Sequence, residues 1–295
     1  MATEAAPRSH PVETRLAAAM VVGSITSVQC GAALATTLFD QVGSSGAVLM
    51  RSGFGALVLV ALAGRSLPPV RDWLSREVLL FALALAGATL CFYAAIDRLP
   101  LGIAVTFEFL GPLGVAVFGS RRPRDLVWVA LAAVGIVLLS DSGGEGGVDA
   151  LGVVLALIAA GFWALYILQS ARVGELHPGL GGLAAAAIVS TAIVAPFGIA
   201  QGGTDLLALS VLAIGLAVGL LSSAIPYALE LEALRRLPNA VFGVLMSLEP
   251  AAGAIVGFIA LGQDLGAAEI VAIALVVTAS AGALRSAATP VPRDG

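Results

Sequence analysis

The sequence contains no lysine and little charge of either sign. Its basic residues are fifteen arginines, its acidic residues number nineteen, and charged residues make up 12% of the 295 residues. Water-soluble domains carry about 25% charged residues, so this chain lacks the polar groups that a soluble surface requires. The net charge is only −4, and basic residues are not interleaved with aromatic ones. Both observations argue against nucleic acid as a partner.

Cysteine and histidine are scarce as well. Cys30 and Cys91 fall inside apolar runs without a CxxC motif, while His10 and His177 lie outside such runs. This distribution predicts no metal site and no cofactor. The apolar runs also contain no HExxH motif, no GxGD aspartyl pair and no Ser–His pair. An intramembrane enzyme is therefore disfavoured.

What the sequence has in abundance is apolar residues. They make up 59% of the chain, and the mean hydropathy is +1.01. A helix that spans a bilayer needs roughly 20 mostly apolar residues, and runs of this kind occur at 16–38, 46–64, 77–96, 100–119, 124–140, 150–170, 179–201, 206–229, 238–261 and 266–285. The sequence therefore predicts an all-α membrane protein with ten transmembrane helices, surrounded by the lipid bilayer.

The arginines favour one orientation of these ten spans. If the N-terminus is cytoplasmic, thirteen arginines fall in cytoplasmic segments, Arg98 falls outside, and Arg51 lies within a span. Cytoplasmic loops carry the excess of arginine in membrane proteins, so both termini are predicted to be cytoplasmic. Residues 1–14 contain no short apolar segment with a cleavage site, and we expect them to form a tail rather than a signal peptide.

A short motif recurs at a fixed distance. Arg98-Leu99-Pro100 returns as Arg236-Leu237-Pro238, and the same offset of 138 residues (236 − 98) relates Pro112 to Pro250. Five spans, an odd number, separate the copies, so the two halves are inserted in opposite orientations. Inverted repeats of this kind are typical of transporters; a duplication kept only for packing is the alternative.

The repeat divides the chain into five predicted parts. They are a cytoplasmic tail (1–15), a first five-helix repeat (16–140), a periplasmic linker (141–149), a second five-helix repeat (150–285) and a second cytoplasmic tail (286–295).

Three ionisable residues lie deep in the predicted spans and are functional candidates, because such residues are costly in lipid. Arg51 lies about five residues into the second span and Glu108 about eight into the fourth, so the two either pair or contact substrate. Glu249 stands near the middle of the ninth span, and Gly111 occupies the offset position. An unpaired carboxylate suits proton exchange; the alternative is a protonated Glu249 bonded to a neighbouring helix.

Other polar and aromatic residues accompany these charges. The candidates for a cavity lining are Gln29, Trp163, Tyr166, Ser223, Tyr227 and Glu230. Tyr93 ranks below Trp163, because aromatic residues near span ends commonly form the interfacial belt. Helix kinks are expected at Pro112, Pro226 and Pro250, since proline lacks the backbone N–H that a helix interior needs.

Three segments carry a resemblance to a known family. They are TFEFLGPLGVAVFGSRRPRDLVWVALAAVG (106–135), PYALELEALRRLP (226–238) and FGVLMSLEPAAGAIVGFIALGQ (242–263). With them the chain resembles the threonine/homoserine exporter branch of the EamA-domain drug/metabolite transporters, over roughly residues 16–284. Positions that this branch favours are matched by Arg51, Glu108, Pro112, Glu230, Glu249 and Pro250. Gln263 departs from the pattern, because the superfamily usually has glutamate there.

The resemblance implies a bacterial inner-membrane protein with ten spans and cytoplasmic termini, which exports small amino acids against proton entry. We expect alternating access, with the substrate ammonium near a carboxylate and the substrate carboxylate near Arg51 or a helix N-terminus. Glu249 or Glu108 would exchange the protons. Export of a different metabolite or a drug on the same fold is the alternative, and the oligomeric state stays open.

Overall fold

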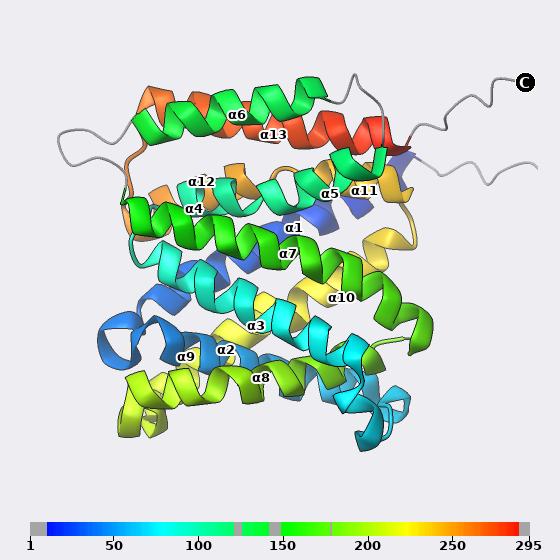
Figure 1. Cartoon of the computed structure of the whole chain (residues 1–295), viewed down its shortest axis with the longest axis vertical. Coiled ribbons are helices and arrows are strands. Elements are labelled where there is room, and N and C mark those ends of the chain that lie inside the picture. The colour runs from blue at the N-terminus through cyan, green and yellow to red at the C-terminus, as the bar shows by residue number, and fades with distance from the viewer. Residues whose placement is uncertain (1–10, 121–125, 142–148, 178, 289–295) are drawn as a thin grey trace, which may run out of the picture.

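The structure is a computed structural model that describes residues 11–120, 126–141, 149–177 and 179–288. These residues form helices and no strand. The long helices lie side by side, and their connections gather at two opposite edges (Figure 1). The first edge, on the left of Figure 1, carries the α3–α4 connection, and the second edge carries the α10–α11 connection. The first turn of α1 and the last turn of α13 both lie at the second edge.

The first half of the chain contains α1 (Pro11–Thr36), α2 (Phe39–Ala63), α3 (Arg76–Ile96), α4 (Leu101–Glu108), α5 (Leu110–Ser120) and α6 (Leu126–Asp141). The second half contains α7 (Ala150–Leu176), α8 (Gly181–Gly202), α9 (Leu209–Gly219), α10 (Ile225–Leu234), α11 (Asn239–Met246), α12 (Glu249–Leu261) and α13 (Ala267–Ala288). Short helical turns complete the fold: η1 (Gly64–Ser66), η2 (Val70–Leu74), η4 (Gly203–Leu207) and η5 (Leu220–Ala224).

Nine helical segments in the described part of the chain are long and apolar enough to cross a membrane. Three of them combine two consecutive α-helices: α4 with α5, α9 with α10, and α11 with α12. The apolar stretch of α6, Leu126–Leu138, is shorter, so the tenth predicted span stays a prediction. The chain is a multi-span membrane protein.

Helix α2 begins earlier than the hydropathy pattern suggests. It starts at Phe39 instead of residue 46, and Gly43, with φ 70° and ψ 172°, interrupts its first turns. Glycine adopts this positive φ without the steric penalty of a side chain. Arg51 therefore lies twelve residues after the start of α2 (51 − 39) rather than five, near the middle of the helix.

Two spans that hydropathy presents as continuous are broken within the membrane. Helix α4 ends at Glu108 and α11 ends at Met246, in each case four residues before a proline, Pro112 or Pro250. Proline has no N–H to give to the carbonyl four residues earlier, and its ring clashes with that carbonyl. The two breaks therefore follow from the two prolines.

The third proline lies next to a different irregularity. Before Pro226 the backbone forms the π-helical turn η5, in which the N–H of Ile225 donates to the carbonyl of Leu220, five residues back. The Leu221 carbonyl instead accepts a hydrogen bond of 2.7 Å from Ser27 Oγ on α1. Single π-helical turns of this type occur frequently at functional sites.

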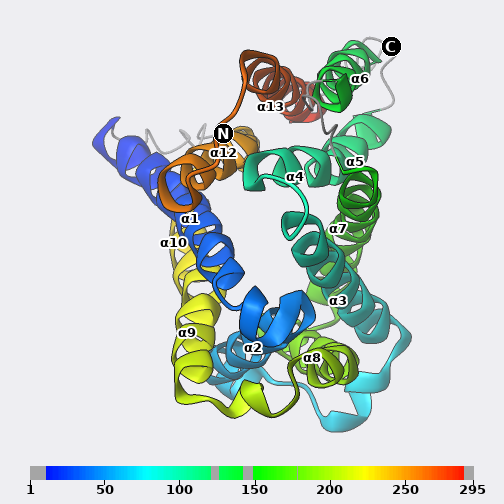
Figure 2. The same ribbon diagram turned by 90° about the vertical axis from the view of Figure 1, so that its left-hand side faces the viewer.

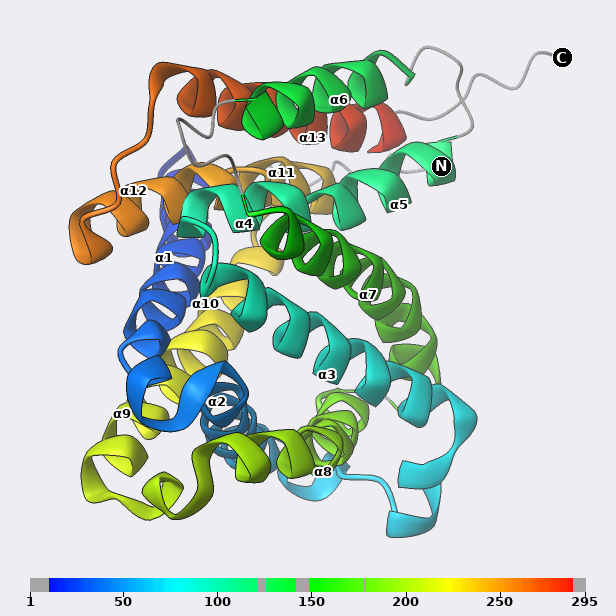
Figure 3. The same ribbon diagram turned by 60° about the vertical axis from the view of Figure 1, so that its left-hand side comes forward.

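Viewed from the first edge, most helices form a ring, with α6 and α13 together outside it (Figure 2, Figure 3). Helices from different halves of the chain pack against each other throughout the described structure, among them α2 with α8, α3 with α7, α1 with α10, α4 with α12, and α6 with α13. Small residues allow close approach between helices in lipid. At the α5–α7 contact, a β-carbon on Gly111 would overlap the backbone carbonyl of Ala160.

Candidate functional site

A cavity of about 350 Å³ lies among the helices of this ring. Pockets that bind small molecules typically measure about 300–1,000 Å³. All nine side chains that the sequence nominates for binding or coupling line this one cavity: Gln29, Arg51, Glu108, Trp163, Tyr166, Ser223, Tyr227, Glu230 and Glu249. Pro226 lines it too, whereas Pro112 and Pro250 do not belong to the lining. Residues from six predicted spans thus meet at one place.

The charges of the cavity are three carboxylates and one guanidinium. In the described part of the chain Arg51 forms no ion pair with Glu108 or any other carboxylate. The Arg51 Cζ atom lies 5.5 Å from the ring centroid of Tyr93 instead. This distance is within the range of a cation–π interaction. The guanidinium N–H groups are therefore available to a ligand with a carboxylate.

The carboxylates of Glu230 and Glu249 have different surroundings. Glu230 on α10 accepts a hydrogen bond of 2.6 Å from Ser24 Oγ on α1. Glu249 is the first residue of α12 and only 5% of it is exposed. No hydrogen bond joins its side chain to a neighbouring helix within the residues that the structure describes. Glu249 thus faces the cavity without a protein partner.

Two buried oxygens of the lining also have no hydrogen-bond partner among the described residues, Gln29 Oε1 and Tyr93 Oη. Gln29 is 3% exposed and Tyr93 1%. An unpaired buried polar atom costs about 1–3 kcal/mol. Such an atom therefore needs an explanation, for which a missing ligand or water is a common one.

Tyr93 has a larger part in the cavity than its place near a span end suggests. Sequence reasoning ranks it below Trp163, because aromatic residues near span ends commonly form the interfacial belt, whereas the structure buries it in the cavity wall. Thr89, which also lines the cavity, lies four residues before Tyr93. Residues four apart share a helix face, so a polar Thr-xxx-Tyr stripe on α3 is the sequence signal that would have identified this position. Further hydroxyl groups of the lining that the sequence does not single out belong to Ser52, Thr89 and Ser190.

Aromatic rings complete the wall of the cavity. Trp163 on α7 packs edge-on against Phe109, with ring centroids 5.6 Å apart and planes at 90°. Phe109 is the residue between α4 and α5, so Trp163 lies against the helix break. Tyr166, one turn further along α7, packs against Phe81 at 5.2 Å. These contacts restrict the rings in the cavity wall.

At the first edge, the two halves of the chain are in direct contact. The guanidinium of Arg98 lies 3.2 Å from Asp149 Oδ2, and the Leu101 N–H donates to Gln263 Oε1 at 2.9 Å. Gly102 packs so closely that a β-carbon there would lie 2.6 Å from Ala254 Cα. The N–H of Gly152 and then the Arg98 guanidinium hold the pKa of Asp149 below its usual value.

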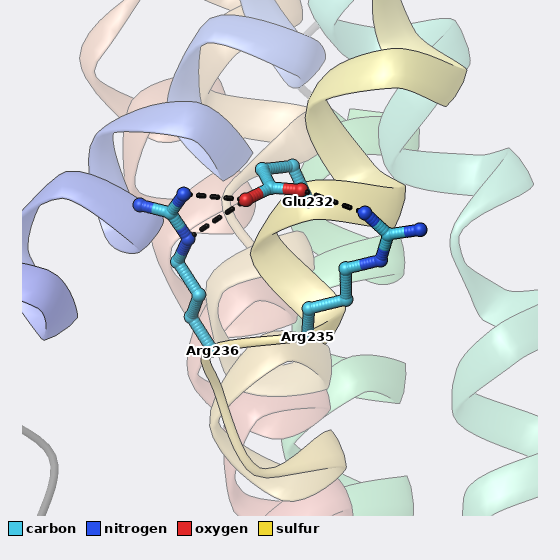
Figure 4. Close-up of polar contacts among 3 residues, drawn as sticks. All are labelled: Glu232, Arg235 and Arg236. Carbon is cyan, nitrogen blue, oxygen red and sulfur yellow. Dashed lines mark hydrogen bonds and ion pairs between the residues drawn. The ribbon is translucent and has the colours of Figure 1, made fainter.

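The second edge differs from the first, although α1 packs against α10 and α11 there. Glu232 on α10 accepts hydrogen bonds from Arg236 and, at 3.2 Å, from Arg235 (Figure 4). All three residues belong to one helix end. Within the described residues α5 and α11 make no contact comparable to the packing of α4 on α12.

The lining suits a small zwitterion better than a metal ion. No group of three or more His, Cys, Asp or Glu side chains in the described ranges is arranged to hold a metal. Carboxylates and a guanidinium in one apolar cavity offer partners for an ammonium and for a carboxylate of the same ligand.

Several known transporters are similar in sequence to this chain. The sequence model of the EamA-like transporter family matches residues 150–285. The chain is 42% identical, over 88% of both chains, to the threonine/homoserine exporter RhtA of Salmonella typhimurium strain LT2 and to that of Escherichia coli strain K12. It is 26% identical to the uncharacterised transporter YwfM of Bacillus subtilis, over 79% of this chain and 80% of YwfM. A crystal structure of a protein with 19% identity has a similar fold, with a TM-score of 0.58 over 94% of this chain and 99% of that one.

Proposed function

Because the chain belongs to the EamA-like transporter family, on the branch of RhtA, we propose that it exports small neutral amino acids of the threonine and homoserine type. It is a membrane transporter and not an enzyme. The observation that carries the proposal is the 42% identity to RhtA along 88% of the chain. The proposed location is the bacterial inner membrane, with both termini in the cytoplasm, on the arginine-rich side.

The cavity supports an amino acid as the cargo. We propose that Arg51 receives the substrate carboxylate, because its guanidinium has no carboxylate partner in the described part of the chain. Glu108 and Glu249 would receive the ammonium, and Trp163, Tyr166 and Tyr227 would enclose the side chain. Ser223 and Glu230 would lie at the end of the cavity toward the second edge.

We further propose that α6 is the tenth span. It has 16 residues, which corresponds to a length of about 24 Å at 1.5 Å per residue. It packs along α13, which is itself long enough to span. Helix α1 begins and helix α13 ends at the same edge (Figure 1), and this requires an even number of crossings between them. Ten spans satisfy this requirement and nine do not.

The same elements support two inverted repeats, 16–140 and 150–285, with the linker 141–149 between them. Adding 138 to the bounds of α4, residues 101 and 108, gives 239 and 246, the bounds of α11. Exchange of the halves also preserves the packing of the spans. The pair of α3 and α7 becomes α10 and α1, while α2–α8 and α6–α13 map onto themselves.

The proposal of alternating access rests on this symmetry and on one helix contact that departs from it. Exchange of the halves turns the α4–α12 contact into a contact of α11 with α5. The structure has the first contact and no comparable second one among its described residues. We propose that transport exchanges the two arrangements, so that the cavity opens at the first edge when α5 and α11 close the second.

Proton exchange is the proposed driving reaction, with Glu249 or Glu108 as the exchanging group. The experiment uses purified protein in vesicles loaded with labelled threonine or homoserine. We expect amino-acid efflux that increases when an inward proton gradient is imposed. Equal efflux with and without the gradient would exclude proton coupling and leave export intact. No efflux of any amino acid would contradict the proposed function.

A second cargo class deserves the same assay, because the cavity holds three carboxylates and a single arginine. This excess of negative charge, beside aromatic rings, favours a cationic metabolite or drug. Inhibition of threonine efflux by organic cations, with protection of cells against those cations, would support this alternative.

A further inference from the structure

The two unpartnered oxygens in the cavity wall have specific neighbours. A β-carbon on Gly253 would lie 3.3 Å from Gln29 Oε1, and Gly253 is one helical turn after Glu249 on α12. Gln29 therefore lies beside the face of α12 that presents Glu249. The Tyr93 ring lies under the guanidinium of Arg51. Each oxygen thus belongs to a residue next to one of the charged groups proposed to hold the substrate.

With the charged groups of the substrate assigned to these neighbours, one group of the substrate still has no partner in the protein. If the ammonium binds a carboxylate and the substrate carboxylate binds Arg51, the side chain of threonine or homoserine still contributes a hydroxyl. A hydroxyl donates one hydrogen bond and accepts others, and a phenol does the same. An amide offers an acceptor at one end and donors at the other, so a hydroxyl pairs with Gln29 in either orientation of the amide.

We infer that Gln29 and Tyr93 bind the side-chain hydroxyl of the substrate and make the transporter selective for hydroxylated amino acids. This inference rests on the proposed function and adds two specificity-determining residues to it. The Gln29 amide reaches a ligand by rotation about its terminal torsion, which has a broad profile. A substrate without a hydroxyl leaves both oxygens unpaired, and sites of this kind reject such analogues strongly.

One compound serves as the reference for both substrates. Replacing the hydroxyl of either threonine or homoserine by hydrogen yields 2-aminobutyrate. Vesicles that contain the wild-type protein are loaded with an equimolar mixture of the three labelled amino acids, and the efflux rates are compared. We expect threonine and homoserine to leave at least about tenfold faster than 2-aminobutyrate, which is the selectivity of one good hydrogen bond.

The variants are Tyr93→Phe and Gln29→Leu. Tyr93→Phe removes the hydroxyl and keeps the ring under Arg51, and Gln29→Leu removes the amide at similar size. We expect each to reduce the preference over 2-aminobutyrate to less than about threefold, while efflux of 2-aminobutyrate itself continues. Each should also melt at the same temperature as the wild type or higher without substrate, because it removes a buried polar atom that has no partner.

The control is Ser280→Ala. Ser280 Oγ is the third buried oxygen without a partner among the described residues, and it lies on α13, away from the cavity lining. This variant should keep the wild-type preference. Unchanged preference in Tyr93→Phe and Gln29→Leu, or a wild type that exports all three amino acids equally, would overturn the inference and leave the export function standing. A lower melting temperature in both variants would assign the two oxygens a structural role and overturn it as well.

Discussion

At the scale of the residue, the cavity depends on polar side chains that lipid tolerates poorly. A charged group at the bilayer centre costs about 2.5–3.5 kcal/mol on insertion scales, and the cavity holds four of them. Among the residues that the structure describes, only Glu230 of these four has a hydrogen bond from a neighbouring helix, the one from Ser24. Arg51 is held over the Tyr93 ring. The hydrogen-bonding groups of these side chains that have no protein partner face the cavity, as a ligand-binding site requires.

Replacing the cavity carboxylates one at a time distinguishes a residue that binds the substrate from a residue that couples transport to protons. Glu249→Gln keeps the size of the side chain and removes its ability to exchange a proton. We expect basal threonine efflux at least about tenfold lower than in the wild type, corresponding to about 1.4 kcal/mol, and no stimulation by a proton gradient. Efflux from vesicles with and without the gradient measures both effects.

Glu108→Gln provides the comparison for this experiment. If Glu108 binds the ammonium and Glu249 exchanges the proton, Glu108→Gln weakens substrate affinity and retains stimulation by the gradient. A Glu249→Gln protein that is still stimulated by the gradient would remove Glu249 from the coupling reaction.

At the scale of the element, prolines and glycines decide how the helices meet. Pro112 and Pro250 break two spans at residues related by the repeat, and the breaks place Glu108 and Glu249 at helix ends inside the membrane. Gly102 and Ala254 let α4 and α12 touch at the first edge. The α4–α12 contact therefore acts as the closed side of the proposed alternation.

Enlarging Gly102 tests that contact. Gly102→Ala places a β-carbon against Ala254, and overpacking of this kind costs about 1–3 kcal/mol. This cost applies only to the conformation that is closed at the first edge. The fraction of molecules that are open at the first edge should therefore increase about tenfold. We expect a cysteine at position 32, in the cavity lining, to react correspondingly faster with an impermeant maleimide from that side.

The matched control is Gly114→Ala, in the other part of the same span. No atom lies within 4 Å of a β-carbon at this position, so the substitution should leave the labelling rate at the wild-type value. Both variants are made in a background in which Cys30 and Cys91 are replaced by alanine. Equal labelling rates in the two variants would contradict a gate at the α4–α12 contact.

At the scale of the whole molecule, the ring of helices is built almost entirely from contacts between the two halves. Helices of the two halves alternate around the cavity (Figure 2), so neither half forms the site alone. The family model matches residues 150–285, and the cavity lining nevertheless includes Gln29, Arg51 and Glu108 from the other half. This arrangement is expected for two repeats that move relative to each other.

The orientation of the molecule can be measured with single cysteines. Arg71 lies on the α2–α3 connection at the second edge with 84% of its side chain exposed, and Asp205 lies on the exposed turn η4 between α8 and α9. In intact spheroplasts we expect Asp205→Cys to react fully with an impermeant maleimide. Arg71→Cys should react at least about tenfold more slowly until the membrane is permeabilised, since we propose that the arginine-rich side faces the cytoplasm. The reverse pattern would invert the topology.

The sequence by itself determined that the protein is surrounded by lipid, that its fold is all-α, and which residues are candidates for the site. Few charges and long apolar runs require a lipid surface whatever the tertiary arrangement, and Gln29, Arg51, Glu108 and Glu249 are conspicuous because polar residues are rare in such runs. Pro112 and Pro250 marked the interruptions, since the missing N–H is a local property of the chain.

Only the tertiary structure decided which of these residues share a cavity and which atoms lack partners. Tyr93 looked interfacial from its distance to the span end, yet packing against Arg51 and Phe39 buries it in the wall. Arg51 lies near the middle of α2, rather than near its start as expected, because Gly43 allows the helix to begin at Phe39. Hydropathy records how apolar each segment is, whereas the face that a side chain turns to its neighbours depends on how the helices pack.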